Sequence, residues 1–304
     1  MKTNLKILVA TDYSEAATNA VKYALQFAAD TNSEITFLHV YKASATYPAE
    51  FTSLERFDDS PIEYETRELD QHIDEIIRSF KFEQGKFAHK CFVRQGHAGE
   101  QICEEAIYSK ADMIIVGTHG ATELHQIFLG SHTWDVIKKA SIPVLAIPGK
   151  AIYNGVHNFV LGTEFRTGEL PVIKFLVNWI KSFNGKLELF HINNDVFSEE
   201  FERELMAKFK DEVHDNIPDE KLSIRMINNP NIIDGVNDFC EKSKSSWLVM
   251  SPEKSHLFEK LLNPVISTTK KMSFYTHVPM LTLPDYTSPY NHAFWNKAKE
   301  QLMI

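Results

Sequence analysis

The chain has 304 residues, of which 43% are hydrophobic and 24% are charged, and its formal net charge is -9. This length predicts two globular domains, each large enough to bury a core. Because binding to nucleic acids and anionic membranes is largely electrostatic, the acidic balance and the lack of long Lys or Arg runs exclude both as expected partners.

The cysteines and the apolar stretches indicate a cytoplasmic protein. The three cysteines, Cys91, Cys103 and Cys240, have no Cys-x-x-Cys or other metal-type spacing, which is typical of reduced thiols. The first apolar run, Ile7–Ala10, is shorter than the apolar region of a signal peptide and is soon followed by Asp12. No stretch of the sequence approaches the length of a membrane span.

Strands and helices are predicted to alternate through the first half of the chain. Ile7–Ala10 is typical of a buried parallel strand, and a second strand is predicted from about Ile35 to Val40. Further strands are predicted at Cys91–Val93, Met113–Val116 and Val144–Ile147. Apolar residues at helical spacing predict helices between them. The predicted helix faces are Ala17, Val21, Ala24, Leu25 and Ala28; Leu69, Ile73, Ile76, Ile77 and Phe80; and Ile102, Ala106 and Ile107.

The second half repeats this order of elements. Asn4–Val40 and Val156–Ile192 align at a constant offset of 152 without a gap. Later strands are predicted at Trp247–Met250 and Met280–Leu283. The predicted helix faces are Ile173, Leu176, Val177 and Ile180, and Phe201, Leu205, Phe209 and Val213. A final helical face, expected to pack on the body of the protein, is formed by Phe294, Trp295, Ala298 and Leu302.

The alternation of strands and helices predicts an α/β fold. We expect two tandem, open, parallel-sheet domains of Rossmann-like type, with helices on both faces of each sheet. The boundary is predicted near Gly149–Val156, which divides the chain into domains 1–150 and 151–304. The long loop predicted from Tyr41 to about Pro61 lies outside the repeat.

A glycine-rich segment follows the fourth predicted strand. Its pattern is Gly-Thr-His-Gly at 117–120, then nine residues, then Gly130 and Ser131. Glycines remove side chains where a backbone turns tightly or approaches a ligand closely. Ser131 is predicted to cap a helix that continues through Trp134 and Ile137, and helix N-termini favour phosphate. The segment therefore predicts a phosphate-binding loop.

Asp12 stands directly after the first predicted strand. In open α/β sheets, ligands bind at the carboxyl ends of the strands, at the point where the strand order reverses. If the first and fourth strands flank that point, Asp12 and Gly117 face each other across one crevice. An acidic side chain there can bind ribose hydroxyls or a magnesium ion.

The glycine pattern resembles the nucleotide-binding segment of universal stress proteins. Three further features match that family: Thr11-Asp12 after the first strand, His39-Val40 at the end of the second, and the closing Pro143-Val144-Leu145. The resemblance covers both halves, so the chain is identified as a tandem member. It implies a cytoplasmic stress-response protein that binds ATP or a related adenine nucleotide through its first domain.

The resemblance also implies which residues form the site. Asp12 would contact ribose, phosphate or Mg²⁺, and Val40 would hold adenine through its backbone. The glycines would wrap the phosphates, and no residue is assigned a catalytic role. The implied nucleotide-binding residues are Ala10, Thr11, Asp12, Val40, Val116, Gly117, Gly120, Gly130, Ser131, His132 and Thr133.

The second half departs from the glycine pattern. Ser251, Lys254 and Pro264-Val265 stand where the first half has Gly117, Gly120 and Gly130-Ser131. Pro264 has no N–H to offer a phosphate, although Glu164 keeps an acid at the position of Asp12. We therefore expect a degenerate domain that acts as a scaffold; a different ligand there is the alternative.

The family resemblance further implies how the two domains pair. They would form an intramolecular pseudo-dimer through their last strands, Val144–Ile147 and Met280–Leu283. A homodimer of whole chains is a further expectation. His119, His125 and His132 raise the hypothesis of a metal site, but their spacings of six and seven residues favour ordinary polar histidines.

Three functions remain open from the sequence. The first is a nucleotide-binding regulator, and the second is a slow ATP hydrolase in which Asp12 acts with magnesium. Neither a Walker-type lysine nor an evident catalytic base supports the second, so the protein is not expected to be an efficient enzyme. The third is an interaction scaffold with a vestigial site, against which the intact glycines of the first half argue.

Overall fold

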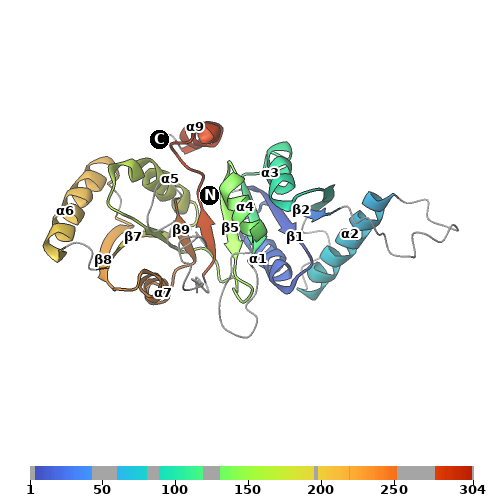
Figure 1. Cartoon of the computed structure of the whole chain (residues 1–304), viewed down its shortest axis with the longest axis horizontal. Coiled ribbons are helices and arrows are strands. Elements are labelled where there is room, and N and C mark those ends of the chain that lie inside the picture. Colours follow the sequence, from blue (N-terminus) through green and yellow to red (C-terminus); the bar gives the residue numbers. More distant parts are fainter. Residues whose placement is uncertain are drawn as a thin grey trace.

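The computed structural model describes residues 4–42, 60–80, 89–118, 131–194, 198–218, 220–251 and 278–302, and their strands form one ten-stranded sheet (Figure 1). The first half contributes β1 (Lys6–Thr11), β2 (Glu34–Tyr41), β3 (His89–Gln95), β4 (Met113–Gly117) and β5 (Val144–Ile147). The second half contributes β6 (Asn158–Gly162), β7 (Lys186–Asn193), β8 (Leu222–Asn228), β9 (Trp247–Met250) and β10 (Met280–Thr282).

The strand order is β3-β2-β1-β4-β5-β10-β9-β6-β7-β8. Read from its outer edge, each half therefore has the same order, since β8-β7-β6-β9-β10 repeats β3-β2-β1-β4-β5. Neighbouring strands within each half are parallel. Between the halves β5 and β10 are antiparallel, with Leu145 opposite Leu281. The two halves lie side by side in Figure 1 and share one sheet through this pair.

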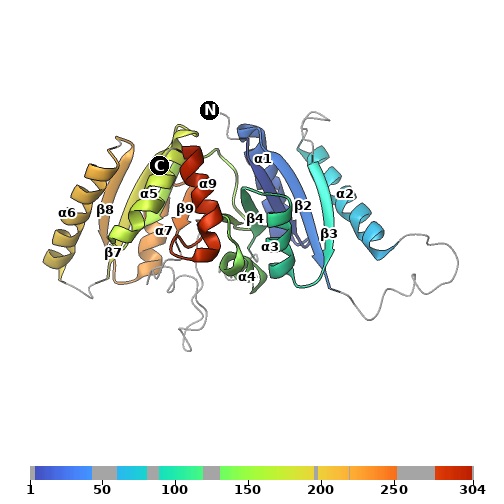
Figure 2. The same ribbon diagram turned by 90° about the horizontal axis from the view of Figure 1, so that it is seen from above.

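Helices cover both faces of the sheet. They are α1 (Glu15–Thr31), α2 (Pro61–Ser79), α3 (Ala98–Tyr108), α4 (Ser131–Lys139), α5 (Leu170–Lys181), α6 (Glu199–Asn216), α7 (Ile232–Lys242) and α9 (His292–Leu302), with short 3₁₀ turns η2 (Thr167–Glu169) and η3 (Pro289–Asn291). One apolar core contains residues of α1, α2, α5, α6 and α9, and a second contains residues of α3, α4 and α7. In Figure 2, α2 and α6 lie at opposite ends of the molecule. The predicted open α/β fold is confirmed.

Local signals explain how α1 leads away from the end of β1. The Ser14 hydroxyl caps the helix by accepting a hydrogen bond from the Ala17 amide at 3.2 Å. The predicted apolar face is buried against the sheet, and the helix ends at Asn32, whose left-handed backbone (φ 53°) is a common C-terminal geometry. The cap therefore starts α1 close to Asp12. This places the carboxylate of Asp12 at the carboxyl end of β1.

The same turn follows the first strand of each half. Tyr13 after β1 and Phe165 after β6 have left-handed backbones, with φ values of 64° and 57°. Each ring lies against a histidine of the neighbouring strand: Tyr13 is 4.5 Å from His39, and Phe165 is 4.6 Å from His191, between ring centroids. Thus the repeat read from the sequence extends to the side chains of the turn.

Aromatic side chains join the two halves on one face of the sheet. Trp247 of β9 is fully buried, and its indole N–H donates a hydrogen bond to the Tyr23 hydroxyl of α1 at 2.8 Å. The indole also contacts Phe27 of the first half and stacks on Phe159 of the second, with centroids 5.2 and 5.0 Å away. Side chains of both halves therefore share one core at this junction.

The C-terminal helix α9 packs on the body, as its apolar face predicts. Trp295 and Ala298 are buried, and Phe175 of α5 lies 5.4 Å from the Trp295 ring. Lys297 reaches the first half, where its ammonium lies 2.6 Å from a carboxylate oxygen of Asp112. This helix thus contacts both halves.

One predicted helix cap differs from the structure, and one predicted loop lies largely beyond it. Helix α4 begins at Ser131, so this residue belongs to the first turn rather than preceding it. Most of the predicted loop from Tyr41 to Pro61 lies outside the described residues. Of the helices that the structure describes, none is both long and apolar enough to cross a bilayer.

Candidate functional site

A crevice opens where the strand order of the first half reverses. The crossover places β1 between β2 and β4, with Ala10 paired to Val116, so the carboxyl ends of β1 and β4 lie side by side. Residues at these two ends line a pocket of about 610 Å³, counting the space at its open mouth. This is the position where open α/β sheets bind ligands.

Most of the predicted site residues meet in this crevice. Those that line it are Ala10, Thr11, Asp12, Val40, Val116, Gly117, His132 and Thr133. Gly120 and Gly130 lie outside the described residues, and so does the side chain of Ser131. The prediction that Asp12 and Gly117 border one crevice agrees with this geometry, whereas the role of each residue toward a ligand remains a prediction.

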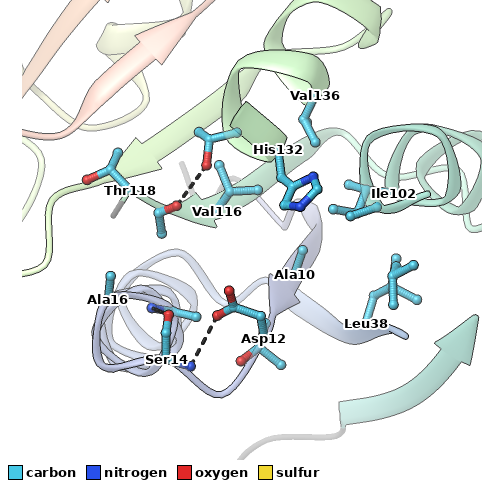
Figure 3. Close-up of a pocket in the computed structure, with 16 residues that line it drawn as sticks. Ala10, Asp12, Ser14, Ala16, Leu38, Ile102, Val116, Thr118, His132 and Val136 are labelled. Atoms are coloured by element: carbon cyan, nitrogen blue, oxygen red, sulfur yellow. Dashed lines mark hydrogen bonds between the residues drawn. The ribbon is translucent and has the colours of Figure 1, made fainter. Parts of the chain in front are cut away.

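Asp12 supplies the negative charge of the crevice. One of its carboxylate oxygens accepts a hydrogen bond from the Ser14 amide at 3.1 Å, and the side chain is exposed to solvent. The carboxylate keeps further acceptor capacity, and because the side chain is exposed, a ligand hydroxyl or cation can reach it. Figure 3 shows Asp12 between the aliphatic end of the crevice, at Leu38, and the opposite end, at Ala16.

The facing wall is built by β4 and the start of α4. The Thr133 hydroxyl donates to the Gly117 carbonyl at 3.0 Å, which fixes the first turn of α4 against the end of β4. Thr118 donates its amide to the Ile147 carbonyl of β5 at 2.9 Å. The first N–H groups of a helix have no intrahelical acceptor, so the start of α4 presents donors and a positive dipole to this crevice. His132 is exposed in the same turn.

The remaining lining residues were not predicted from the sequence. They are Ser14, Ala16, Ala17, Leu38, Ala98, Ile102, Thr118 and Val136. Leu38 precedes Val40 by two residues and so shares a face of β2, which is a usable signal. Ala98 and Ile102 share a face of α3, but the crossing of α3 over the sheet is tertiary information. These aliphatic side chains give the crevice an apolar end.

The structure explains by close packing why a glycine occupies position 117, which the sequence did not show. A Cβ at this position would lie 2.7 Å from the carbonyl carbon and oxygen of Ala16 and 2.8 Å from the Ala17 amide nitrogen. All three atoms belong to the backbone of the first turn of α1, which cannot yield as a flexible side chain could. The glycine therefore lets α1 pack closely against the end of β4, whatever its role toward a ligand.

Gly117→Ala is therefore expected to lower the free energy of unfolding by ~1–3 kcal/mol, the usual range for overpacking. The matched control is Ser251→Ala, because Ser251 occupies the corresponding position after β9. Its hydroxyl is buried without a hydrogen-bond partner among the described residues, so its removal should be neutral or stabilising. Denaturant unfolding of both variants measures the difference; equal effects would contradict this explanation of the glycine.

In the second half, the polar groups of the turn after β6 bind one another. The Glu169 carboxylate accepts hydrogen bonds from the Thr163 hydroxyl and from the Glu164 amide, the latter at 3.0 Å. Burial raises the pKa of Glu169 to about 7. Glu164, the counterpart of Asp12, forms an ion pair with Arg166 at 2.5 Å. The acid that could meet a ligand is thus already paired within the protein.

The histidine hypothesis is only partly addressed by the structure. His132 lines the crevice, while His119 and His125 lie outside the described residues. A metal site formed by these three side chains therefore gains no support from the geometry.

Comparisons with known proteins relate both the sequence and the fold to one family. Residues 3–148 match the model of the universal stress protein family. A universal stress protein of Methanocaldococcus jannaschii is 32% identical over 156 residues, which is 48% of this chain and 95% of the relative. A second one from the same organism is 32% identical over 144 residues, 47% of this chain and 81% of that relative.

The fold comparison extends over both halves. The crystal structure of a universal stress protein from Archaeoglobus fulgidus superposes with a TM-score of 0.61 at 16% sequence identity. It covers 93% of this chain and 99% of that one. At this level of identity the likeness concerns the fold, and it includes the second half, which lies beyond the residues matched by the family model.

Proposed function

Because the chain belongs to the universal stress protein family, we propose that it is a stress-response regulator whose first half binds ATP or a related adenine nucleotide. The ligand occupies the crevice at the ends of β1 and β4. One observation carries this proposal: eight residues that the sequence assigns to nucleotide binding line a single crevice where the strand order reverses.

The apolar end of the crevice suits the adenine ring. Leu38, Ala98 and Ile102 offer aliphatic surface against which a planar base can be buried. Val40, next to the last residue of β2, is assigned to the polar edge of the base through its backbone. An aromatic base with few hydrogen-bonding edges fits this lining better than a sugar or a peptide would.

The phosphates are assigned to the start of α4. The N-terminus of a helix and its dipole attract anions, and the Thr133 hydroxyl and the His132 imidazole belong to the first turn of α4. No Lys or Arg occurs among the described lining residues. The affinity for the phosphates therefore depends on backbone donors, and Gly120 and Gly130 are proposed to contribute further ones.

Asp12 is assigned to the ribose hydroxyls, or to a magnesium ion bridging to the phosphates. Carboxylate oxygens are suitable ligands for Mg²⁺, which usually keeps several waters as well. Slow ATP hydrolysis through such an ion is the alternative function. We favour a protein that holds nucleotide, because the sequence offers neither a Walker-type lysine nor an evident catalytic base.

The two halves are proposed to act as domains 1–150 and 151–304 of one intramolecular pseudo-dimer. The antiparallel pairing of β5 with β10 and the shared core at Trp247 support this interpretation. The second domain is assigned a scaffold role, since Glu164 is paired with Arg166. The protein is expected to work in the cytoplasm, and a homodimer of whole chains is a further expectation.

Asp12→Ala is expected to weaken ATP binding by ~10- to ~100-fold, because hydrogen bonds to a charged group contribute ~1.5–3 kcal/mol. The side chain is exposed, so the fold should persist. Glu164→Ala is the matched control and should leave the affinity unchanged. Calorimetric titration of both variants decides the matter: an unchanged Asp12→Ala affinity, or equal losses in the two variants, would remove Asp12 from the site.

A further inference from the structure

A second cluster of ligand-type side chains lies between α2 and β3, apart from the nucleotide crevice. Asp70 projects from α2, and His89 and Cys91 project from β3. One carboxylate oxygen, one imidazole nitrogen and the sulfur all lie within 4.8 Å of one another. None of the three residues lines the crevice. The cluster combines the N, S and O donors that zinc accepts.

The repeat shows what these positions hold when they serve only for packing. His89 and Cys91 pair with Ile35 and Phe37 of β2. In the second half, Leu222 and Ile224 of β8 pair with the corresponding residues of β7. Both are aliphatic and pack against the core. The first half therefore has an imidazole and a thiol where the second half has two aliphatic side chains.

The polar atoms of the cluster are poorly satisfied by the described protein groups. His89 Nδ1 is buried and has no hydrogen-bond partner in the part of the chain that the structure describes. The Cys91 sulfur and a carboxylate oxygen of Asp70 lie within 4.8 Å of each other and of an imidazole nitrogen of His89. An unpaired buried nitrogen is costly in a packed interior, and a bound cation removes this penalty.

We propose that Asp70, His89 and Cys91 bind a Zn²⁺ ion that joins α2 to β3. Tetrahedral zinc, with bonds of ~2.0–2.3 Å, places its ligand atoms about 3.3–3.8 Å apart, so shifts of about 1 Å close the site. Zinc displaces the thiol proton to solvent and binds the thiolate, and a carboxylate oxygen of Asp70 becomes a second ligand. The fourth position is taken by water or by Asp74, one helical turn from Asp70.

Such an ion would hold α2 to the edge strand of the first half. β3 is the outermost strand of the first half, and α2 covers it at one end of the molecule (Figure 2). The three ligands belong to elements separated in sequence, so the ion is bound by the folded state and stabilises it by mass action. The first half thereby becomes responsive to zinc through a site that works independently of the nucleotide.

The test uses the full-length, tag-free protein and two metals. Zn²⁺ affinity is measured by competition with a chromophoric chelator, and Co²⁺ is added as a spectroscopic substitute. We expect one Zn²⁺ per chain, a higher melting temperature with Zn²⁺, and a thiolate-to-cobalt charge-transfer band. Cys91→Ser should abolish this band and weaken Zn²⁺ binding by ~100-fold or more, beyond the 10–100-fold typical of outer-shell changes.

Two further variants keep the result interpretable. Cys103→Ser removes the other half-buried thiol of the first half and should leave the band and the affinity unchanged. The double variant His89→Leu with Cys91→Ile reproduces the pairing of the second half, so it should fold and lose Zn²⁺ binding. The proposal is overturned if the wild type shows no thiolate band, or if the folded double variant still binds Zn²⁺ as tightly.

Discussion

Trp247→Ala is expected to lower the free energy of unfolding by about 3–5 kcal/mol, the usual cost of truncating a buried tryptophan. The indole is fully buried and touches Phe27 of the first half and Phe159 of the second, so its loss leaves a cavity at the junction. It also removes the donor to the Tyr23 hydroxyl, which is itself buried. A hydroxyl left without its partner adds a desolvation cost.

Denaturant unfolding of the full chain measures this effect. Tyr23→Phe is the companion variant: it keeps the packing and leaves only the indole N–H unpaired, so a smaller loss of ~1–3 kcal/mol is expected. A Trp247→Ala loss below that of Tyr23→Phe would show that the aromatic junction contributes little. The role of this core in joining the halves would then be wrong.

The elements of the fold could be predicted because their signals are local. The strand Trp247–Met250 has the same bounds in the sequence prediction and in the structure, and all five apolar residues assigned to the first helix face are buried. Buried parallel strands are recognised by runs of apolar residues, and amphipathic helices by the helical period of such residues. The gap-free repeat then predicted that strands and helices follow the same order in both halves.

The side-chain contacts at the junction of the halves could not be predicted in the same way. Tyr23 and Trp247 lie 224 residues apart, and nothing near either residue indicates the hydrogen bond between them. Likewise, the ion pair between Lys297 and Asp112 joins two surfaces that meet only after the sheet has formed. Such contacts depend on how completed elements pack, which local periodicity does not encode.

Some residues of the candidate site could likewise be predicted from the sequence, and others could not. Asp12 and Gly117 were predictable, since residues directly after parallel strands gather at one edge of the sheet. The aliphatic end at Ile102 was not, because it depends on how α3 crosses the sheet. Cysteine spacing gave no metal signal either, since Asp70 reaches His89 and Cys91 from a separate helix.

Ala98→Trp is expected to weaken ATP binding by ~100-fold or more, equivalent to about 2.7 kcal/mol. Ala98 is the first residue of α3 and lies half-buried in the lining of the crevice beside Ile102. An indole there fills the apolar end that is assigned to adenine, so the base loses its buried surface. The side chain starts at a helix terminus and at the surface, so the fold should tolerate it.

Ile232→Trp is the matched control, because Ile232 is also half-buried and begins α7, which like α3 has 11 residues and follows the third strand of its half. Calorimetric titration with ATP of the wild type and both variants tests the central claim most directly. We predict one site per chain in the wild type and in Ile232→Trp, and a loss of ~100-fold or more in Ala98→Trp. Two equal sites in the wild type, no binding at all, or equal losses in both variants would contradict a nucleotide site in the first half.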